Sequence, residues 1–362
     1  MSASAPVLIM AGGTGGHIFP GLAVAERLRE QGVPVAWLGA RGGMEADVVA
    51  ARQIPLHLIV VGGLRGKGWG KRLLAPFMLL RALFAAWRVL RKLRPRSVLS
   101  MGGYAAGPGG LAAWLLRVPL VVHEQNRVAG VTNRLLAHVA REVLTGFADV
   151  LPRGRWVGNP VREAIALVPP PPQRFATRSG RPRLLVLGGS LGARALNLAL
   201  PRALATIPPR QRPEVVHQCG TRGLDEAREA YAAAVVEVQL VAFIDDMAAR
   251  YAWADLAVCR AGALTLAELT AVGLGALLVP FPHAVDDHQT RNAEALVAAG
   301  AARLMSEDRH AVQALDPEAL AACLEAMLDS RSQLLAMAEA ARTLAKPDAA
   351  QVIARTCVEV GA

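Results

Sequence analysis

The sequence predicts an α/β protein with doubly wound parallel sheets, because one design recurs three times along the chain. Each repeat has a short apolar strand, a glycine-rich turn and a helix, and the strands begin near Val7, Val98 and Arg183. Strands that are apolar at four or five successive positions are typical of parallel sheets covered by helices on both faces. A chain of 362 residues is long enough for two such sheets, each in its own domain.

The expected elements follow in order. Strands are expected at residues 7–11, 98–101, 119–122, 183–187, 214–219, 255–259 and 276–281. A helix follows the first turn, because Ile18, Leu22, Ala25 and Leu28 recur at helical spacing until Gly32 ends it. The last element, residues 347–360, is expected to be a helix with a proline in its first turn.

The chain is expected to divide near residues 158–175. A glycine-rich start near residue 10 recurs near residue 187, and a proline-rich stretch without periodicity, Val168-Pro-Pro-Pro-Pro-Gln173, lies between them. We therefore expect two similar α/β domains, joined in this stretch, with a cleft between them. Ligands of such sheets bind at the carboxyl ends of the strands, so both glycine turns should face that cleft.

Most of the positive charge lies in the first half of the chain. Residues 1–163 hold 21 Lys and Arg against 8 Asp and Glu, whereas residues 164–362 hold 19 against 21. Four cysteines stand far apart without a C-x-x-C pair, which argues against a disulfide framework and a tetrahedral zinc site. No base precedes Arg27 and the first apolar run is short, so we expect a cytosolic protein without a signal peptide or membrane span.

The glycine turns are suited to phosphate. Their backbone N–H groups can approach a ligand closely, and the helix that follows adds partial positive charge. Neither turn has the G-x-G-x-x-G or Gly-Lys-Ser/Thr pattern, and the next strand of each half ends without the acidic residue of a dinucleotide site. These absences disfavour a dehydrogenase, although Arg41 keeps an NADP site open. Tight packing of strand against helix is the structural alternative for these glycines.

Polar side chains at two points of the first half are candidates for catalysis. His17 ends the first turn at the start of a helix, where the helix dipole favours a neutral ring that can accept a proton. His123-Glu124-Gln125-Asn126 follows an apolar strand, so it should face the cleft. The alternatives are that His17 caps or packs the helix and that the second group is an ordinary loop.

The second half has its own polar groups. Thr265 and Glu268 fit a capping box, and the competing hypothesis is that Glu268 accepts hydrogen bonds from a ribose. Residues 286–292, Asp-Asp-His-Gln-Thr-Arg-Asn, carry donors suited to sugar hydroxyls. Their acids and histidine also resemble metal ligands, but no second cluster supplies the rest of a metal site.

Residues 65–96 hold ten Lys and Arg and no acid, interleaved with apolar residues such as Phe77, Phe84 and Trp87. Arg81 and Arg88 interrupt the run, which disfavours a transmembrane helix. We expect a basic amphipathic helix that docks on an anionic membrane surface. A solvated basic helix and a nucleic-acid surface are the alternatives, and no nucleic-acid motif supports the latter.

Taken together, these loops resemble the MurG family of glycosyltransferases. The residues that carry the resemblance run in the family's order from residue 12 to residue 289. They are Gly12-Gly-Thr-Gly-Gly-His17, Met101-Gly-Gly-Tyr104, Gly107-Pro-Gly-Gly110, His123-Glu-Gln-Asn126, Val157-Gly-Asn-Pro-Val-Arg162, Gly188-Gly-Ser190, Gly192-Ala-Arg194, Phe243-Ile-Asp-Asp-Met247, Gly262-Ala-Leu-Thr265 and His288-Gln289.

The resemblance implies a GT-B fold, in which two Rossmann-like doubly wound domains face a central cleft. It implies an acceptor domain at the cytoplasmic face of the membrane, residues 1–162, to which the final helix, residues 341–362, returns. It also implies a donor domain, residues 163–340, that binds UDP-N-acetylglucosamine. The implied activity is inverting transfer of N-acetylglucosamine to undecaprenyl-pyrophosphoryl-N-acetylmuramoyl-pentapeptide in peptidoglycan synthesis, beside other cell-wall synthesis and division proteins.

The resemblance also assigns site residues. His17 and Glu124 are the candidate catalytic bases, and Tyr104 and Asn126 the acceptor contacts. The implied donor contacts are Thr14, Gly15, Gly16, Asn126, Arg162, Ser190, Ile244, Ala263, Leu264, Thr265, Leu266, Ala267, Glu268 and Gln289. No metal or other cofactor is expected to be required, since no Asp-x-Asp tripeptide occurs. A lipid galactosyltransferase, a UDP-sugar epimerase and a non-catalytic binding protein remain the alternatives.

Overall fold

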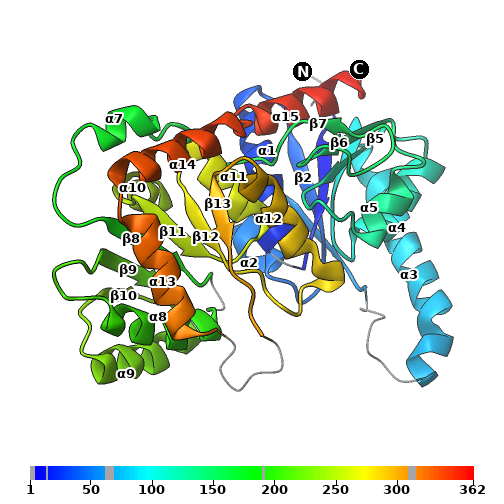
Figure 1. Ribbon diagram of the computed structural model, residues 1–362. Helices are drawn as coiled ribbons and strands as arrows, with labels where there is room; N and C mark the ends of the chain where they lie inside the picture. Colours follow the sequence, from blue (N-terminus) through cyan, green and yellow to red (C-terminus); the bar gives the residue numbers. More distant parts are fainter. Residues whose placement is uncertain (1–4, 14, 62–68, 190–191, 309–314) are drawn as a thin grey trace. The chain divides into compact units, whose positions relative to one another are not determined.

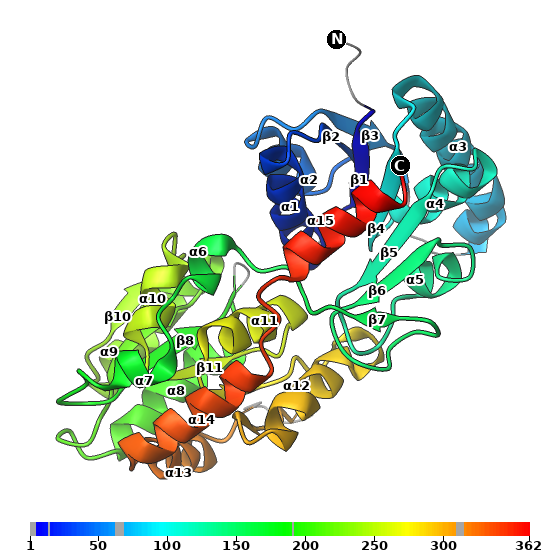
Figure 2. The same cartoon turned by 90° about the horizontal axis from the view of Figure 1, so that it is seen from above.

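The computed structural model describes residues 5–13, 15–61, 69–189, 192–308 and 315–362, in two compact units (Figures 1 and 2). Unit 1 comprises Met1–Arg162 and Lys346–Ala362, and unit 2 comprises Glu163–Ala345. The first boundary lies where the sequence places it. The return to unit 1 lies at Lys346 rather than at residue 341, because residues 331–343 form a helix that packs within unit 2.

Unit 1 contains a parallel sheet of seven strands within the described residues. In spatial order they are β3 (Leu56–Ile59), β2 (Val35–Ala40), β1 (Val7–Ala11), β4 (Ser97–Gly102), β5 (Leu120–Glu124), β6 (Glu142–Thr145) and β7 (Arg155–Trp156). The helices are α1 (Gly15–Glu30), α2 (Glu45–Ala50), α3 (Trp69–Leu93), α4 (Ala106–Leu115), α5 (Val131–Leu136) and α15 (Ala349–Glu359). The order confirms the doubly wound arrangement for this half.

Alternating residues of β1 form two separate cores in unit 1. Val7 and Ile9 pack with residues of α1 and α15 on one face of the sheet. Leu8 and Met10 pack with residues of α3 and α4 on the other, so helices cover both faces (Figure 2). This burial on both faces is the physical reason that these strands are apolar throughout.

Unit 2 repeats the plan with six strands within the described residues. Their order is β10 (Gln239–Val241), β9 (Glu214–Gln218), β8 (Arg183–Leu187), β11 (Leu256–Cys259), β12 (Ala276–Leu278) and β13 (Ala302–Leu304), all parallel. The helices are α6 (Glu163–Ala166), α7 (Pro171–Phe175), α8 (Arg194–Thr206), η1 (Thr221–Gly223), α9 (Leu224–Ala234), α10 (Met247–Trp253), α11 (Ala263–Val272), η2 (Val285–Asp287), α12 (His288–Ala298), α13 (Pro317–Leu328) and α14 (Arg331–Thr343).

Four expectations from the sequence need correction. The strand expected at residues 276–281 ends at Leu278. The strand β5 extends through His123 and Glu124, because their polar side chains are satisfied by buried hydrogen bonds. The proline-rich stretch contains the short helix α7, which has Pro171 at its first position. The final helix α15 begins at Ala349 after the N-cap Asp348, so Pro347 precedes the helix instead of lying in its first turn.

Candidate active site at the two switch points

Each sheet has one point where the strand order reverses. In unit 1 it lies between β1 and β4, and in unit 2 between β8 and β11. Ligands of open α/β sheets bind outside the carboxyl ends of the strands at such switch points. The turns that follow these four strands hold most of the candidate residues. Two of the candidates, Thr14 and Ser190, lie outside the described residues.

The first glycine turn is packed closely against the turn that follows β4. Gly103 has a φ of +91°, and a Cβ there would overlap the backbone carbonyl of Gly12. Glycine is therefore required at Gly103 both by conformation and by space. The carboxylate of Glu45 supports the same turn, since it is fully buried and its Oε2 accepts a hydrogen bond from Gly13 N at 3.3 Å.

His17 lies in the first turn of α1 and is half-buried. Its Nδ1 lies 2.8 Å from Gln125 Oε1, which follows β5 directly. Gly15 and Gly16, the other described candidates of this turn, form the start of α1, where helical N–H groups have no partner within the helix. This turn can therefore offer both anion-binding donors and an imidazole.

His123 and Glu124 are buried rather than exposed. The Nε2 of His123 is 2.9 Å from the carbonyl of Gly158, and burial lowers the pKa of His123 to about 4 despite that bond. Glu124 accepts hydrogen bonds from Gly130 N at 3.2 Å and from Asn133 Nδ2 at 3.0 Å through Oε2. Its carboxylate thus fixes the loop after β5, which weakens its candidacy as a base.

The remaining candidates of unit 1 differ in exposure. Asn126 is half-buried, and its backbone N–H donates to Glu124 Oε1 at 3.0 Å. Tyr104 is 56% exposed in the turn between β4 and α4. Arg162 is exposed at the last residue of the first segment of unit 1. Asn126 and Tyr104 can therefore meet an incoming ligand from two neighbouring loops of one sheet edge.

In unit 2, the helix α11 begins earlier than the capping box required. Gly262 is its N-cap, so Thr265 is the third helical residue and caps nothing, which makes the capping interpretation wrong. Glu268 instead accepts a hydrogen bond from the hydroxyl of the buried Tyr251 at 2.9 Å. Residues 263–268 therefore form a helix start without a side-chain cap, and the carboxylate of Glu268 is held in the second turn.

Arg174 of α7 holds the other end of α11. Its guanidinium donates to the carbonyls of Val272 at 3.1 Å and Gly273 at 2.5 Å, and to that of Tyr251 at 3.3 Å. Burial is the main cause that lowers the pKa of Arg174, to about 10, so the group stays charged at neutral pH. A cation at the carboxyl end of a helix is favoured by the helix dipole.

The other candidates of unit 2 line the same edge. Ile244 is buried shortly after β10. Gln289, in the first turn of α12, accepts a hydrogen bond from Phe281 N at 2.9 Å through Oε1, which positions the side-chain amide. Asn292 ties α12 to the loop after β11 through a 3.3 Å bond to the carbonyl of Ala261. The loops after β11 and β12 are thereby joined.

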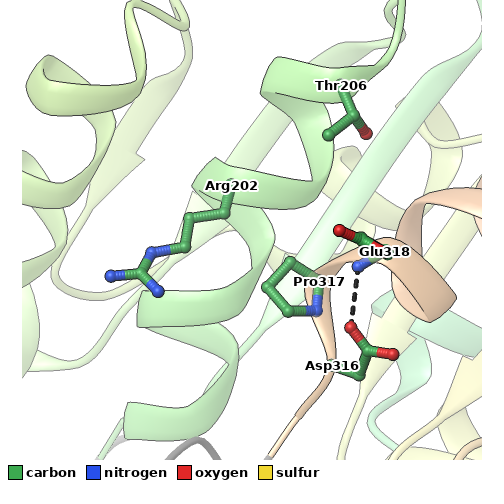
Figure 3. Close-up of a pocket in the computed structure, with 5 residues that line it drawn as sticks. All are labelled: Arg202, Thr206, Asp316, Pro317 and Glu318. Carbon is green, nitrogen blue, oxygen red and sulfur yellow. Dashed lines mark hydrogen bonds between the residues drawn. The ribbon is translucent and has the colours of Figure 1, made fainter.

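A surface pocket elsewhere on unit 2 contains none of the candidates. It lies between α8 and α13 and is lined by Arg202, Thr206, Asp316, Pro317 and Glu318 (Figure 3). Asp316 caps α13 there by accepting from Glu318 N at 3.0 Å. Among the residues that the structure describes, no group of three or more His, Cys, Asp or Glu could hold a metal ion.

Several supporting residues are not found from the sequence, namely Glu45, Asn133, Tyr251 and Arg174, and Gly158 is found only as part of a motif. Each acts through a partner far away in the chain, such as Tyr251 on Glu268 or Arg174 on Gly273. The one signal that the sequence offers is a polar residue among apolar neighbours. Asn133, which is buried in the short helix α5, is an example.

The likeness to known proteins covers almost the whole chain. Residues 7–145 match the glycosyltransferase family 28 N-terminal domain, and residues 183–353 match the family 28 C-terminal domain. Two relatives carry the name UDP-N-acetylglucosamine--N-acetylmuramyl-(pentapeptide) pyrophosphoryl-undecaprenol N-acetylglucosamine transferase. The one from Alkalilimnicola ehrlichii is 60% identical and the one from Nitrosococcus oceani 55% identical, each over 98% of both chains.

A solved structure gives the same result. The crystal structure of MurG from Acinetobacter baumannii matches with a TM-score of 0.83 and 40% identity, over 98% of this chain and 99% of that one. Fold, motifs and sequence identity therefore agree over both units. The chain belongs to glycosyltransferase family 28 and, within it, to the MurG family.

Proposed function

We infer that this chain transfers N-acetylglucosamine from UDP-N-acetylglucosamine to undecaprenyl-pyrophosphoryl-linked N-acetylmuramoyl-pentapeptide, with inversion at the anomeric carbon. The main support for this function is the 60% identity, over 98% of both chains, to the relative from Alkalilimnicola ehrlichii whose name gives this transferase activity. Two phosphate-suited turns, one at each switch point, agree with a reaction between two diphosphate-bearing substrates.

Unit 2 is proposed as the donor domain. The start of α11, which Gly262 leaves without a side-chain cap, suits an anionic or hydroxyl ligand. Glu268, oriented by Tyr251, suits the ribose hydroxyls, and the Gln289 amide suits those of the sugar. Ile244, residues 263–268 and Ser190 complete the proposed contacts in this unit, with Arg162, Asn126, Thr14, Gly15 and Gly16 contributed by unit 1.

Unit 1 is proposed as the acceptor domain with the catalytic base. The acceptor hydroxyl attacks the anomeric carbon, UDP departs, and His17 takes the hydroxyl proton. Tyr104 and Asn126 are the proposed acceptor contacts. No metal is proposed for the departing diphosphate, because the starts of α1 and α8 supply backbone N–H groups and partial positive charge.

The proposed location of the enzyme is the cytoplasmic face of the membrane. Among the described residues, no helix is both long and apolar enough to cross a bilayer. The helix α3 and its neighbour α4 present exposed apolar residues, including Phe77, at 69% exposure, and Trp114. The exposed bases Arg81, Arg88 and Arg91 accompany them. Apolar side chains among bases suit a surface of anionic lipid.

Two groups of partners follow from this placement and are proposed with it. The lipid-linked acceptor would reach the enzyme laterally in the membrane. Its product would be consumed by other enzymes of cell-wall synthesis, so these and the division proteins are expected neighbours. Nucleic acid is not proposed as a partner.

Vesicle sedimentation tests the membrane surface. Charge reversal of Arg81, Arg88 and Arg91 should release the protein from vesicles of anionic phospholipid, since each base near such a surface contributes about 1 kcal/mol. Reversal of Lys71 and Arg72, whose side chains are outside the described set, should add to the loss. Reversal of Arg181, Arg210 and Arg303, all exposed on unit 2, gives the same change of net charge as a control. Equal binding by both triple variants would remove this proposal.

Transfer from labelled donors tests the reaction. With a lipid-linked N-acetylmuramoyl-pentapeptide acceptor, label from UDP-N-acetylglucosamine should enter the lipid fraction, and label from UDP-galactose should not. Preferential transfer of galactose would favour the lipid galactosyltransferase. Conversion of UDP-N-acetylglucosamine into an epimeric UDP-sugar, without net release of UDP, would favour the epimerase. An unchanged UDP-sugar with no lipid labelling would favour a binding protein.

A further inference from the structure

We propose that Gln125 is a positioning residue that holds His17 in the tautomer with its proton on Nδ1, so that Nε2 is free to accept the proton of the acceptor hydroxyl. The assignment of His17 as base rests on the proposed function. The tautomer itself rests on a series of hydrogen bonds that runs from the half-buried His17 through the buried Gln125 and His123 to Gly158.

The orientation of the Gln125 amide is fixed by two contacts at its nitrogen. Nε2 lies 2.9 Å from the main-chain carbonyl of His123, which can only accept a hydrogen bond. The same nitrogen lies 3.0 Å from His123 Nδ1. If the amide were rotated by 180°, an oxygen would face that carbonyl without a proton between them. The amide oxygen must therefore face His17.

The orientation of Gln125 determines where the proton of His17 lies. Gln125 Oε1 is an acceptor only, and it lies 2.8 Å from His17 Nδ1, so Nδ1 carries the hydrogen. In a neutral imidazole the other nitrogen, Nε2, then has a lone pair. This nitrogen belongs to a half-buried side chain in the first turn of α1, and that side chain bonds to the residue directly before the predicted acceptor contact Asn126.

The far end of the chain is consistent with the same assignment. His123 accepts at Nδ1 from Gln125, so its own hydrogen is on Nε2, and it donates to the carbonyl of Gly158 at 2.9 Å. Full burial keeps this ring neutral at physiological pH. Every donor in this series of hydrogen bonds thus meets an acceptor. Reversing any one of the bonds would place two donors or two acceptors together.

The arrangement suits proton transfer from a sugar hydroxyl. As the new bond forms between the acceptor oxygen and the anomeric carbon, the bond from that carbon to UDP breaks and the hydroxyl proton moves to His17 Nε2. The resulting imidazolium keeps its Nδ1–H bond to Gln125, now strengthened by charge.

Nuclear magnetic resonance of the enzyme labelled with ¹⁵N-histidine tests the tautomer directly. The chain has 8 histidines, and the His17 resonances are those that disappear in His17→Gln. In the parent enzyme, we expect neutral His17 to be protonated on Nδ1. In Gln125→Met, which keeps the length of the side chain but has no amide, we expect a large share of Nε2–H tautomer.

Turnover of the same variants tests the consequence. In Gln125→Met, kcat should fall by about one to two decades with KM for donor and acceptor within about threefold, because a misplaced imidazole proton costs up to about four decades. His123→Phe should lose less, since the carbonyl of residue 123 still orients the Gln125 amide. Ser97→Ala, which loses a buried 2.6 Å bond at the opposite end of β4, should retain the parental kcat.

The outcomes separate the two claims. An Nε2–H tautomer in the parent, or an unchanged tautomer in Gln125→Met, would overturn the role of Gln125 whatever His17 does. A shifted tautomer with unchanged kcat would uphold the role of Gln125 in setting the tautomer and overturn His17 as the base. A shifted tautomer together with the loss of kcat supports both.

Discussion

The two switch points have the same strand order but are held in different ways. In unit 1 the glycine turn meets side chains that bond to one another, such as His17 to Gln125 and Glu124 to Asn133. In unit 2 the helix α11 is held from outside, by Arg174 at its last carbonyls and Tyr251 on Glu268. A network of hydrogen-bonded side chains fixes the orientation of a reactive group such as His17. Arg174 instead holds the carboxyl end of α11 and leaves the amino end of that helix open to a ligand. This difference is the one expected under the proposal that unit 1 supplies the catalytic base and unit 2 holds the donor.

Loss of the imidazole should have the largest effect. His17→Ala should lower turnover by about two to four decades, as expected for a general base. Glu124→Ala should lower turnover less, because its carboxylate holds Gly130 and Asn133 instead of substrate. Steady-state kinetics with both variants decides between them. If His17→Ala stays within tenfold of the parent while Glu124→Ala collapses, the two roles must be exchanged.

Acid should destabilise both units to a similar extent. Burial lowers the pKa of His123 in unit 1 to about 4 and that of His217 in unit 2 to about 3. In the unfolded chain both titrate near 6.5, so between these values the unfolded state binds more protons and stability falls as pH falls. Each histidine should cost about 2 kcal/mol between pH 7.5 and pH 5. Urea unfolding at the two pH values measures this, and a flat profile would show that these rings are not buried in neutral form.

A matched pair of glycines compares the two turns after β4 and β11. Gly103→Ala should destabilise unit 1 by about 1–3 kcal/mol, since φ is +91° and the Cβ would overlap Gly12. Gly262→Ala should change stability by less than about 0.5 kcal/mol, because φ is −68° and a Cβ would meet only Thr265 Oγ1 at 3.8 Å. Thermal unfolding of both variants gives the answer. Equal losses would show that the two turns are equally constrained.

The fold could be predicted from the sequence further than the site could. Apolar strands and glycine turns are local signals, and they located β1, β4 and β8. The sequence pattern ends β5 at the first polar residue, whereas in the structure His123 stays within the strand and bonds to Gly158, 35 residues away. Glu268 lies three residues after Thr265 and so imitates a capping box, but Gly262 starts the helix. Hydrogen bonds between residues that are far apart in the sequence leave no local pattern by which they could be predicted.

Calorimetric titration with UDP is the most direct test of the proposal that unit 2 binds the donor and unit 1 supplies the catalytic base. Glu268→Gln should weaken UDP binding by about one to two decades, the cost of losing a charged hydrogen-bond acceptor, and Tyr251 still has an oxygen to bond. His17→Ala should bind UDP within about threefold of the parent. We expect this contrast between the two units. Loss of UDP affinity in His17→Ala, with parental affinity in Glu268→Gln, would contradict it.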